Sequence, residues 1–271
     1  MSISMHGFKC LLIADDLTGA CDAAVQFTRQ GHQTVVSLGL DFSSVQAAVL
    51  GFSTNSRDLE PEWIQALMSD LAARLAVRDA RVIFKKIDST LRGHAGCEIA
   101  AALVAFDCEA AVIAPAFPAM GRVVETGFLR VESDTRFQPI ELRGRLESQG
   151  AGPCTHVAAD GVSAALDSRA RFISADAVCD GDLDKVVAAG LASGRRLLWA
   201  GSAGLASALA GALSPEATSS SDLPKSAAGV LFCIGSDHPV TMAQQHRLLS
   251  ARRSLLAHPE QLTRDCLAFA G

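Results

Sequence analysis

Short apolar runs alternate with helix-like stretches through most of this chain, and this alternation is what most constrains its fold. The expected strands are 9–14, 34–38, 49–52, 82–84, 110–114, 155–158, 171–174 and 197–200. Helices are expected to begin near Gly19, Pro61 and Glu98. Parallel strands need crossover connections, which are usually helices. The pattern therefore predicts an α/β, Rossmann-like fold, in which helices cover both faces of a mostly parallel sheet.

The composition changes between Ser214 and Gly229, where the chain is small, polar and interrupted by two prolines. Such a composition is typical of an exposed linker. We therefore expect a first domain over 1–213, a linker over 214–229, and a first strand and helix of a truncated second α/β domain over 230–271. The final segment is smaller than the usual independent domain. It is either an appendage of the first domain or the start of a domain that this chain lacks.

Net charge, cysteine spacing and the length of apolar runs argue against several classes of protein. The formal net charge of −5 argues against a nucleic-acid partner. The eight cysteines are scattered without a CxxC pair, which favours a reduced, cytoplasmic protein over a disulfide scaffold. Apolar runs are too short for a signal peptide or a membrane span, so we expect no membrane partner. The sequence leaves open whether the chain forms a homo-oligomer.

The polar stretch after the expected strand 82–84 concentrates charges and hydroxyls within a few residues. Ligands of open α/β sheets bind at the carboxyl ends of the strands. A small ligand with a carboxylate and hydroxyls would suit this loop. Arg92 is expected to clamp the carboxylate and Lys86 to add a point charge, while Asp88 and Ser89 hold hydroxyls. The alternative is a solvated loop with incidental charges.

Adjacent carboxylates follow the expected strand 9–14. Asp15 and Asp16 come directly after this strand, and Asp22 lies further along the following helix. Carboxylates are costly to bury unpaired, so such a cluster suits hydroxyl orientation, general-base work or a cation. Alternatively, one aspartate caps the helix and the others are solvated. The spacing is not the DxDxT pattern of a phosphatase nucleophile.

Two further loops carry weaker indications. Arg57 follows the expected strand 49–52, either as a second carboxylate clamp or as a surface residue. Gly201 and Gly204 lie between a strand and a helix, where glycines allow an anion near the helix N-terminus or close helix–strand packing. Neither a Walker A loop nor a GxGxxG fingerprint is present.

Taken together, these segments resemble the four-carbon acid sugar kinase family. The resemblance rests on the segments Ala14–Asp22, Ser56–Arg57, Lys85–His94, Ala114–Arg122, Ile173–Ala177, Gly201–Ala206 and Gly235–Thr241. It covers essentially the whole chain in order. It implies ATP-dependent phosphorylation of a four-carbon sugar acid, such as a threonate, erythronate or oxo-tetronate. The N-terminal domain would hold the sugar acid and the C-terminal domain the nucleotide.

The resemblance also implies roles for particular residues. The reaction would be in-line transfer of the ATP γ-phosphoryl group, with Mg²⁺ accompanying the nucleotide. Asp15 and Asp16 are the catalytic candidates, and Asp16 is the expected general base. Ser236 is expected to contact ATP. The expected substrate-binding residues are Asp22, Arg57, Lys86, Asp88, Ser89, Arg92 and Arg122.

Two departures from the family pattern bear on these expectations. A Gly-Gly-Glu-Thr-type segment, which contacts ATP in the family, does not appear between Leu248 and Gly271, so most of the ATP domain is expected to be missing. His94 stands where asparagine is common, which could affect substrate choice. The alternatives are a non-enzymatic module that binds a sugar acid or a protein, and a phosphatase or aldolase-like enzyme.

Overall fold

The structure is a computed structural model that describes residues 8–39, 45, 47–75, 80–132, 134, 136–213, 234 and 239–251. The chain divides into two compact units, Met1–Ser219 and Ser220–Gly271. In the second unit the described helix is α8 (Pro239–Ala251). The predicted linker (214–229) and residues 230–233, where the first strand of the second domain is expected, lie outside the described residues. The division into two domains and a linker therefore stays a prediction.

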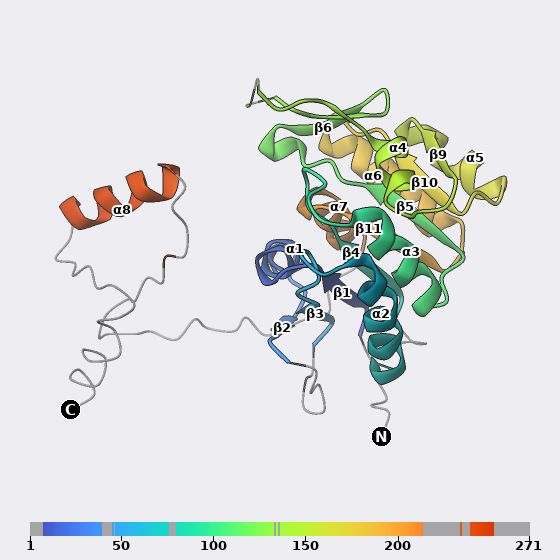
Figure 1. Ribbon diagram of the computed structural model, residues 1–271, viewed down its shortest axis with the longest axis horizontal. Coiled ribbons are helices and arrows are strands. Elements are labelled where there is room, and N and C mark those ends of the chain that lie inside the picture. The colour runs from blue at the N-terminus through green and yellow to red at the C-terminus, as the bar shows by residue number, and fades with distance from the viewer. Residues whose placement is uncertain are drawn as a thin grey trace. The chain divides into compact units, whose positions relative to one another are not determined.

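An eight-stranded sheet runs through the first unit in the order β2-β3-β1-β4-β11-β5-β10-β9 (Figure 1). Its neighbouring strands pair in parallel. The strands are β1 (Cys10–Ala14), β2 (Thr34–Ser37), β3 (Val49–Ser53), β4 (Val82–Lys86), β5 (Ala110–Ala114), β9 (Cys154–Val157), β10 (Phe172–Ala175) and β11 (Leu197–Gly201). Strands β1, β4, β5 and β11 are buried along their whole length. The predicted α/β fold is confirmed.

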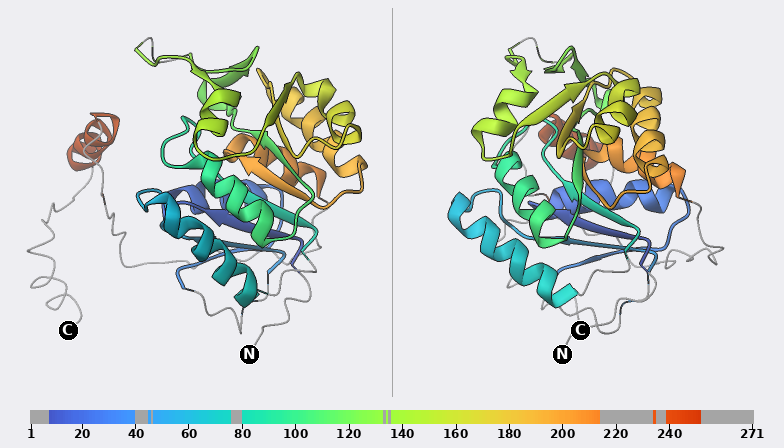
Figure 2. Two further views of the ribbon diagram at one scale, coloured as in Figure 1. Left: turned by 45° about the vertical axis from the view of Figure 1, so that its right-hand side comes forward. Right: turned by 90° about the vertical axis from the view of Figure 1, so that its right-hand side faces the viewer.

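Helices cover both faces of this sheet (Figure 2). They are α1 (Leu17–Arg29), α2 (Pro61–Leu75), α3 (Ala95–Ala105), α4 (Leu142–Ser148), α5 (Val162–Asp167), α6 (Asp180–Ala192) and α7 (Ala203–Ala212). Helices α1, α7, α6 and α5 pack side by side as one layer, and α2, α3 and α4 form the other. Two 3₁₀ turns, Pro118–Met120 and Ala159–Gly161, complete the described helical elements of this unit. None of the described helices is long and apolar enough to cross a membrane.

A small antiparallel sheet consists of β6 (Arg122–Glu125), β7 (Phe128–Val131) and β8 (Ile140–Glu141). Thr126 and Gly127 have φ angles of 49° and 83° and close the β6–β7 hairpin. Positive φ at both central residues matches the twist of the flanking strands. Val124 and Ala177 exchange backbone hydrogen bonds of 3.0 and 2.9 Å, so the hairpin is fixed to the segment just after β10.

The strand before the polar stretch is longer than predicted. Strand β4 continues through Lys85 and Lys86, which pair with Ile13 and Ala14 of β1. The expectation that both lysines lie in a loop is wrong. Lys85 is fully buried, and its ammonium group forms an ion pair with Glu98 of α3. A charged residue can occupy a buried strand when it is paired in this way.

The Gly201–Gly204 segment packs α7 closely against the chain that follows β5. Ser202 caps α7: its hydroxyl accepts a hydrogen bond from the Gly204 N–H at 3.2 Å and donates one to the Ala116 carbonyl at 2.8 Å. A Cβ atom at Gly204 would lie 2.4 Å from the same carbonyl oxygen. Of the two interpretations of these glycines, the structure supports close packing.

Two glycines of α7 give a matched test of this packing. Gly204→Ala should lower the free energy of unfolding by about 1–3 kcal/mol, because backbone atoms must move to admit the methyl group. Gly211→Ala should raise it by about 0.5–1 kcal/mol, because a Cβ atom there meets nothing within 4 Å. Urea denaturation would measure both changes. Equal effects at the two positions would contradict the packing role.

Candidate functional site

The carboxyl ends of β1, β3 and β4 bring three of the predicted segments together. These strands are neighbours, and the loops that follow them meet at one edge of the sheet. The Thr54 N–H donates to the Ala14 carbonyl at 2.8 Å, and the Ser56 N–H donates to the Asp15 carbonyl at 2.9 Å. We call the charged residues gathered here, which are Asp15, Asp16, Arg57, Lys86, Asp88 and Arg92, the edge cluster.

Arg57 joins the two adjacent aspartates. Its Nε donates to Asp15 Oδ2 and its Nη1 to Asp16 Oδ2, both at 2.7 Å. Burial alone would lower the pKa of Arg57, but the two carboxylates raise it above its usual value. Asp16 Oδ1 accepts from the Gly19 N–H at 2.7 Å and caps α1. Both carboxylate oxygens of Asp16 are thus engaged.

Asp15 differs from Asp16 in having an oxygen without a partner. Its residue exposure is 4%. Oδ2 is bound by Arg57, whereas Oδ1 is buried and has no hydrogen-bond partner among the described residues. Buried carboxylate oxygens are costly to leave without a donor. Asp15 Oδ1 is therefore a buried acceptor at this edge that lacks a donor among the described residues.

Lys86 places a buried ammonium group beside these carboxylates. The residue is 4% exposed, and its Nζ donates to the Ile87 carbonyl at 3.1 Å. Burial lowers the pKa of Lys86, although the charges of Asp22, Asp15, Asp88 and Asp16 oppose this. A bound anion near Nζ would further favour the charged form. The structure therefore places the Lys86 side chain within the protein instead of in an open loop.

Asp88 organises the loop after β4. Its Oδ1 accepts from the Thr90 N–H at 2.9 Å, the Thr90 hydroxyl at 2.5 Å and the Arg92 N–H at 3.3 Å. Its Oδ2 accepts from Arg92 Nη2 at 2.6 Å. Leu91 and Gly93, with φ angles of 58° and 76°, turn the chain. The Arg92 side chain is 69% exposed, so much of its guanidinium group faces solvent.

The contacts of Asp88 predict a pH-dependent contribution to stability. Burial would raise the pKa of Asp88, but the hydrogen bonds from Arg92 and Thr90 outweigh it and hold the pKa well below its usual range. A carboxylate whose pKa is depressed in the folded protein contributes its full stabilisation at pH values above its unfolded-state pKa, which is about 3.9 for aspartate. That contribution is lost as the pH falls through the folded-state pKa.

Asp88→Asn should therefore lower the free energy of unfolding by about 1–3 kcal/mol at neutral pH. The difference from wild type should shrink below about pH 4, where the wild-type carboxylate also begins to protonate in the unfolded chain. Urea denaturation over a pH series would show this. A difference that stayed constant from neutral pH down to the folded-state pKa would contradict the assigned ion pair.

The remaining predicted residues are less closely tied to the edge cluster. Ser89 is half-buried in the same loop, and Asp22 is exposed on α1, where its charge acts on Lys86. Arg122 begins β6, and its buried Nε has no hydrogen-bond partner among the described residues. Ser236, the expected ATP contact, lies outside the described residues. The part of the chain that the structure describes has no group of three or more His, Cys, Asp or Glu side chains that could hold a metal ion.

Three buried polar residues beneath the edge cluster were not predicted as one unit. We call Ser56, Lys85 and Glu98 the buried frame. Glu98 Oε1 accepts from the Ser56 hydroxyl at 2.6 Å, and its other oxygen pairs with Lys85. The sequence indicated Ser56 and Lys85 only as neighbours of Arg57 and Lys86. Glu98 was expected only as part of a helix, because its partners are distant in sequence.

A second group of polar side chains includes residues of the segment 173–177, on which the family resemblance partly rests. His156 Nδ1 lies 2.9 Å from the Ser174 hydroxyl, and Nε2 lies 3.0 Å from Asp176 Oδ1. The same Asp176 oxygen accepts from the Gly127 N–H at 2.9 Å. Ser174 is fully buried. The group therefore anchors the β6–β7 hairpin, which carries Arg122, to the ends of β9 and β10.

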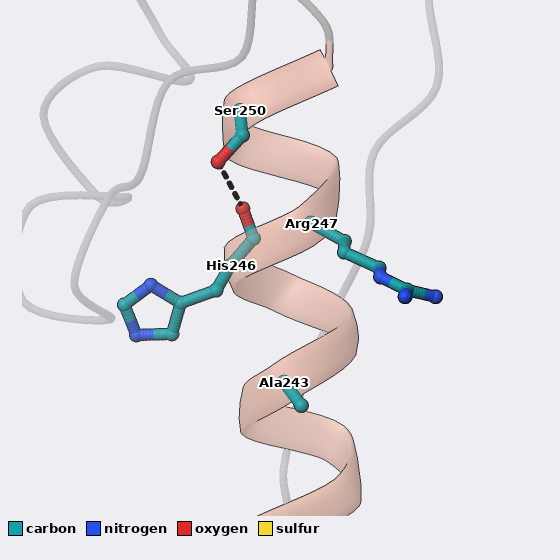
Figure 3. Close-up of a pocket in the computed structure, with 4 residues that line it drawn as sticks. All are labelled: Ala243, His246, Arg247 and Ser250. Atoms are coloured by element: carbon teal, nitrogen blue, oxygen red, sulfur yellow. Dashed lines mark hydrogen bonds between the residues drawn. The ribbon is translucent and has the colours of Figure 1, made fainter.

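The second unit has an open hollow of about 690 Å³ along α8, lined by Ala243, His246, Arg247 and Ser250. Figure 3 shows that all four residues come from this one helix and that the His246 and Arg247 side chains point away from each other. The Ser250 hydroxyl donates to the His246 carbonyl at 2.8 Å. Because its polar groups do not converge, we assign no ligand to this hollow.

Comparison with known proteins connects this edge to a family. Residues 10–209 match the family described as the sugar-binding N-terminal domain. The D-threonate kinase of Bordetella bronchiseptica is 34% identical over 218 residues, which are 73% of this chain and 54% of the relative. The D-threonate kinase of Cupriavidus necator is 36% identical and covers 83% of this chain and 60% of its own length. The chain thus spans a little over half the length of these two curated relatives.

A longer alignment and a solved structure agree with this match. The 3-oxo-tetronate kinase of Pseudomonas fluorescens is 30% identical over 95% of this chain and 69% of its own length. A domain of unknown function from Bordetella bronchiseptica, solved as a domain-swapped dimer with bound citrate, is 32% identical with a TM-score of 0.65. That match covers 75% of this chain and 57% of the solved one. The chain therefore belongs to the sugar-binding N-terminal domain family, within the four-carbon acid sugar kinases that its motifs resemble.

Proposed function

We propose that the protein is an ATP-dependent kinase of a four-carbon sugar acid and that the edge cluster holds this acid. The observation that carries the proposal is Asp15 Oδ1, a buried acceptor that finds no donor in the described part of the chain, in the same cluster as the buried ammonium group of Lys86. A hydroxyl and a carboxylate on one small molecule would satisfy the two groups together. The names of the relatives, which are kinases of D-threonate, D-erythronate and 3-oxo-tetronate, support this substrate class.

Asp15 is our choice for the group that orients the attacking hydroxyl and accepts its proton. Both oxygens of Asp16 are occupied, one by the α1 cap and one by Arg57. Of the two aspartates, Asp15 retains a buried oxygen that has no hydrogen-bond partner among the described residues. Asp16 then contributes by keeping Arg57 in place. This assignment changes the sequence-based preference for Asp16 as general base.

Lys86 and Arg92 are our choice for the groups that bind the substrate carboxylate. Lys86 is buried among carboxylates and gains from an added anion. Arg92 uses Nη2 to hold Asp88, and its exposed guanidinium group has further N–H donors for a second oxyanion. Asp88 sets the position of Arg92, and Ser89 offers a hydroxyl in the same loop. We place Asp22 and Arg122 at the periphery of the substrate site.

ATP with Mg²⁺ would supply the transferable phosphoryl group and neutralise its charge. Within the described residues, α7 does not offer a phosphate cradle at its N-terminus, because Ser202 and the close packing of Gly204 fill that position. Ser236 and the C-terminal part of the protein remain the proposed nucleotide side. The division into a sugar-acid domain over 1–213 and a nucleotide part after the 214–229 linker belongs to the same proposal.

We also propose two properties of the protein as a whole, its location and its oligomeric state. The described cysteines are free, which suits a reducing, cytoplasmic location. A homo-oligomer is proposed because the solved relative is described as a domain-swapped dimer.

The proposal is tested by ADP release from the intact protein with ATP, Mg²⁺ and a panel of acids. D-threonate, D-erythronate and 3-oxo-tetronate are compared with a neutral four-carbon polyol, which lacks the carboxylate. We expect ADP release with at least one acid and none with the polyol. Acid binding without ADP release would favour the non-enzymatic alternative. Phosphate release from a phosphorylated acid would instead indicate a phosphatase.

A further inference from the structure

The buried frame lies beneath the edge cluster and connects three elements. Lys85 belongs to β4, Glu98 to α3, and Ser56 to the loop after β3. Their residue exposures are 0%, 2% and 0%. Both oxygens of Glu98 are engaged, one by the Ser56 hydroxyl and one by the Lys85 ammonium group. The carboxylate is therefore fixed from two sides within the protein.

The frame reaches the edge cluster through the backbone. Ser56 directly precedes Arg57, and its N–H donates to the Asp15 carbonyl. Lys85 Nζ also donates to the Lys86 carbonyl at 3.1 Å. Ser56 Oγ additionally lies 2.7 Å from the Thr54 hydroxyl, which donates to the Ala14 carbonyl. A shift of Glu98 would thus be transmitted to Arg57, Asp15 and Lys86 together.

A gain in stability alone is a weak explanation for burying the ion pair of Lys85 and Glu98. Burying an ion pair removes two charges from water, and well-packed apolar substitutes are often as stable or more stable. We propose that Glu98 is a positioning residue: by holding Ser56, it keeps Arg57 between Asp15 and Asp16 and leaves Asp15 Oδ1 directed at the ligand. The part of this proposal that concerns the ligand depends on the proposed function. The part that concerns Arg57 does not.

Two double variants separate positioning from stability. Lys85→Met with Glu98→Gln removes the ion pair but keeps an acceptor for the Ser56 hydroxyl. Lys85→Met with Glu98→Met removes the ion pair and the acceptor. Ser56→Ala is a third variant that breaks the same hydrogen bond and leaves the ion pair in place. The chain is labelled with ¹⁵N, and hydrogen exchange at Arg57 Nε is followed by NMR alongside urea denaturation and D-threonate binding.

We expect hydrogen exchange at Arg57 Nε to be ~10-fold or more faster in the Glu98→Met double variant and in Ser56→Ala. The reason is that the hydrogen bond from Nε to Asp15 would be formed for a smaller fraction of the time. D-threonate should bind ~10-fold or more weakly to both, whereas the Glu98→Gln double variant, which loses the Lys85 contacts but keeps an acceptor for Ser56, should lose less affinity. Adding Ser56→Ala to the Glu98→Met double variant should cause no further loss, because the bond is already absent.

Unchanged exchange at Arg57 in the folded Glu98→Met double variant and in Ser56→Ala would overturn the proposal. If a double variant does not fold, Ser56→Ala decides the question with the same readout. If D-threonate, D-erythronate and 3-oxo-tetronate all fail to bind the wild-type chain, the proposed function fails. Exchange at Arg57 Nε then still decides whether Glu98 positions the arginine.

Discussion

Asp15→Asn should reduce phosphoryl transfer by the intact protein by about 10²–10⁴-fold, the range for loss of a general base. The near-isosteric amide keeps an oxygen for Arg57 but cannot accept a proton from the substrate hydroxyl. Asp15 was chosen because its Oδ1 is buried and has no partner among the described residues. Steady-state kinetics with the preferred acid would measure kcat, and circular dichroism would check the fold.

Asp16→Asn is the matched control. Asparagine caps helices about as well as aspartate, so α1 should keep its N-terminus. The variant loses a charged partner of Arg57, and a charge-assisted contact of this kind is worth about 1–3 kcal/mol. We expect a loss of stability and a smaller loss of kcat than in Asp15→Asn. A larger kcat loss in Asp16→Asn would return the role of general base to Asp16.

Arg57→Met should lower the free energy of unfolding by about 2–4 kcal/mol at neutral pH. Removing one partner of a buried ion pair leaves an uncompensated charge and costs about 3–5 kcal/mol, less where a partner is partly exposed. Arg57 is 21% exposed in its side chain, and Asp15 is 5% exposed. Without the guanidinium group, two adjacent carboxylates also repel each other.

A matched control separates the effect of this ion pair from the general cost of removing an arginine side chain. Arg74→Met removes an exposed i,i+4 pair with Asp70 and should change stability by less than about 0.5 kcal/mol. A loss in Arg57→Met no larger than the loss in Arg74→Met would contradict the stabilising role of the ion pairs with Asp15 and Asp16.

The fold was predictable because its evidence is local. Buried parallel strands are continuous apolar runs, and glycines or prolines mark the ends of the helices between them. Pro61 begins α2 as predicted, and Gly31, with a φ of 84°, follows the cap of α1, where glycine is common. Strand β4 was predicted too short because Lys85 and Lys86 look like loop residues. Their strand conformation depends on Glu98 and on neighbouring strands, which local polarity does not reveal.

The location of the candidate site was also predictable, whereas its internal contacts were not. The family resemblance assigned Asp15, Arg57 and Asp88 to one site, and the strands that precede them are neighbours whose carboxyl ends meet at one edge of the sheet. The sequence could not show that Arg57 is engaged by two aspartates instead of being free to clamp a substrate. It also could not show which aspartate retains an available oxygen. The first fact depends on side-chain partners that are about 40 residues apart in the chain. The second depends also on the local cap, in which Asp16 Oδ1 accepts from the Gly19 N–H.

Isothermal titration calorimetry of the 271-residue chain with D-threonate, D-erythronate and 3-oxo-tetronate tests whether the edge cluster binds a four-carbon sugar acid. We expect that at least one acid binds at a single site and that the neutral polyol does not bind. The affinity for that acid should fall in Asp15→Ala and in Lys86→Met, while Arg74→Met leaves it unchanged. Absence of binding by every acid at ~1 mM to a folded chain would contradict the assignment of the edge cluster as the sugar-acid site. Wild-type affinity in folded Asp15→Ala and Lys86→Met would contradict it equally.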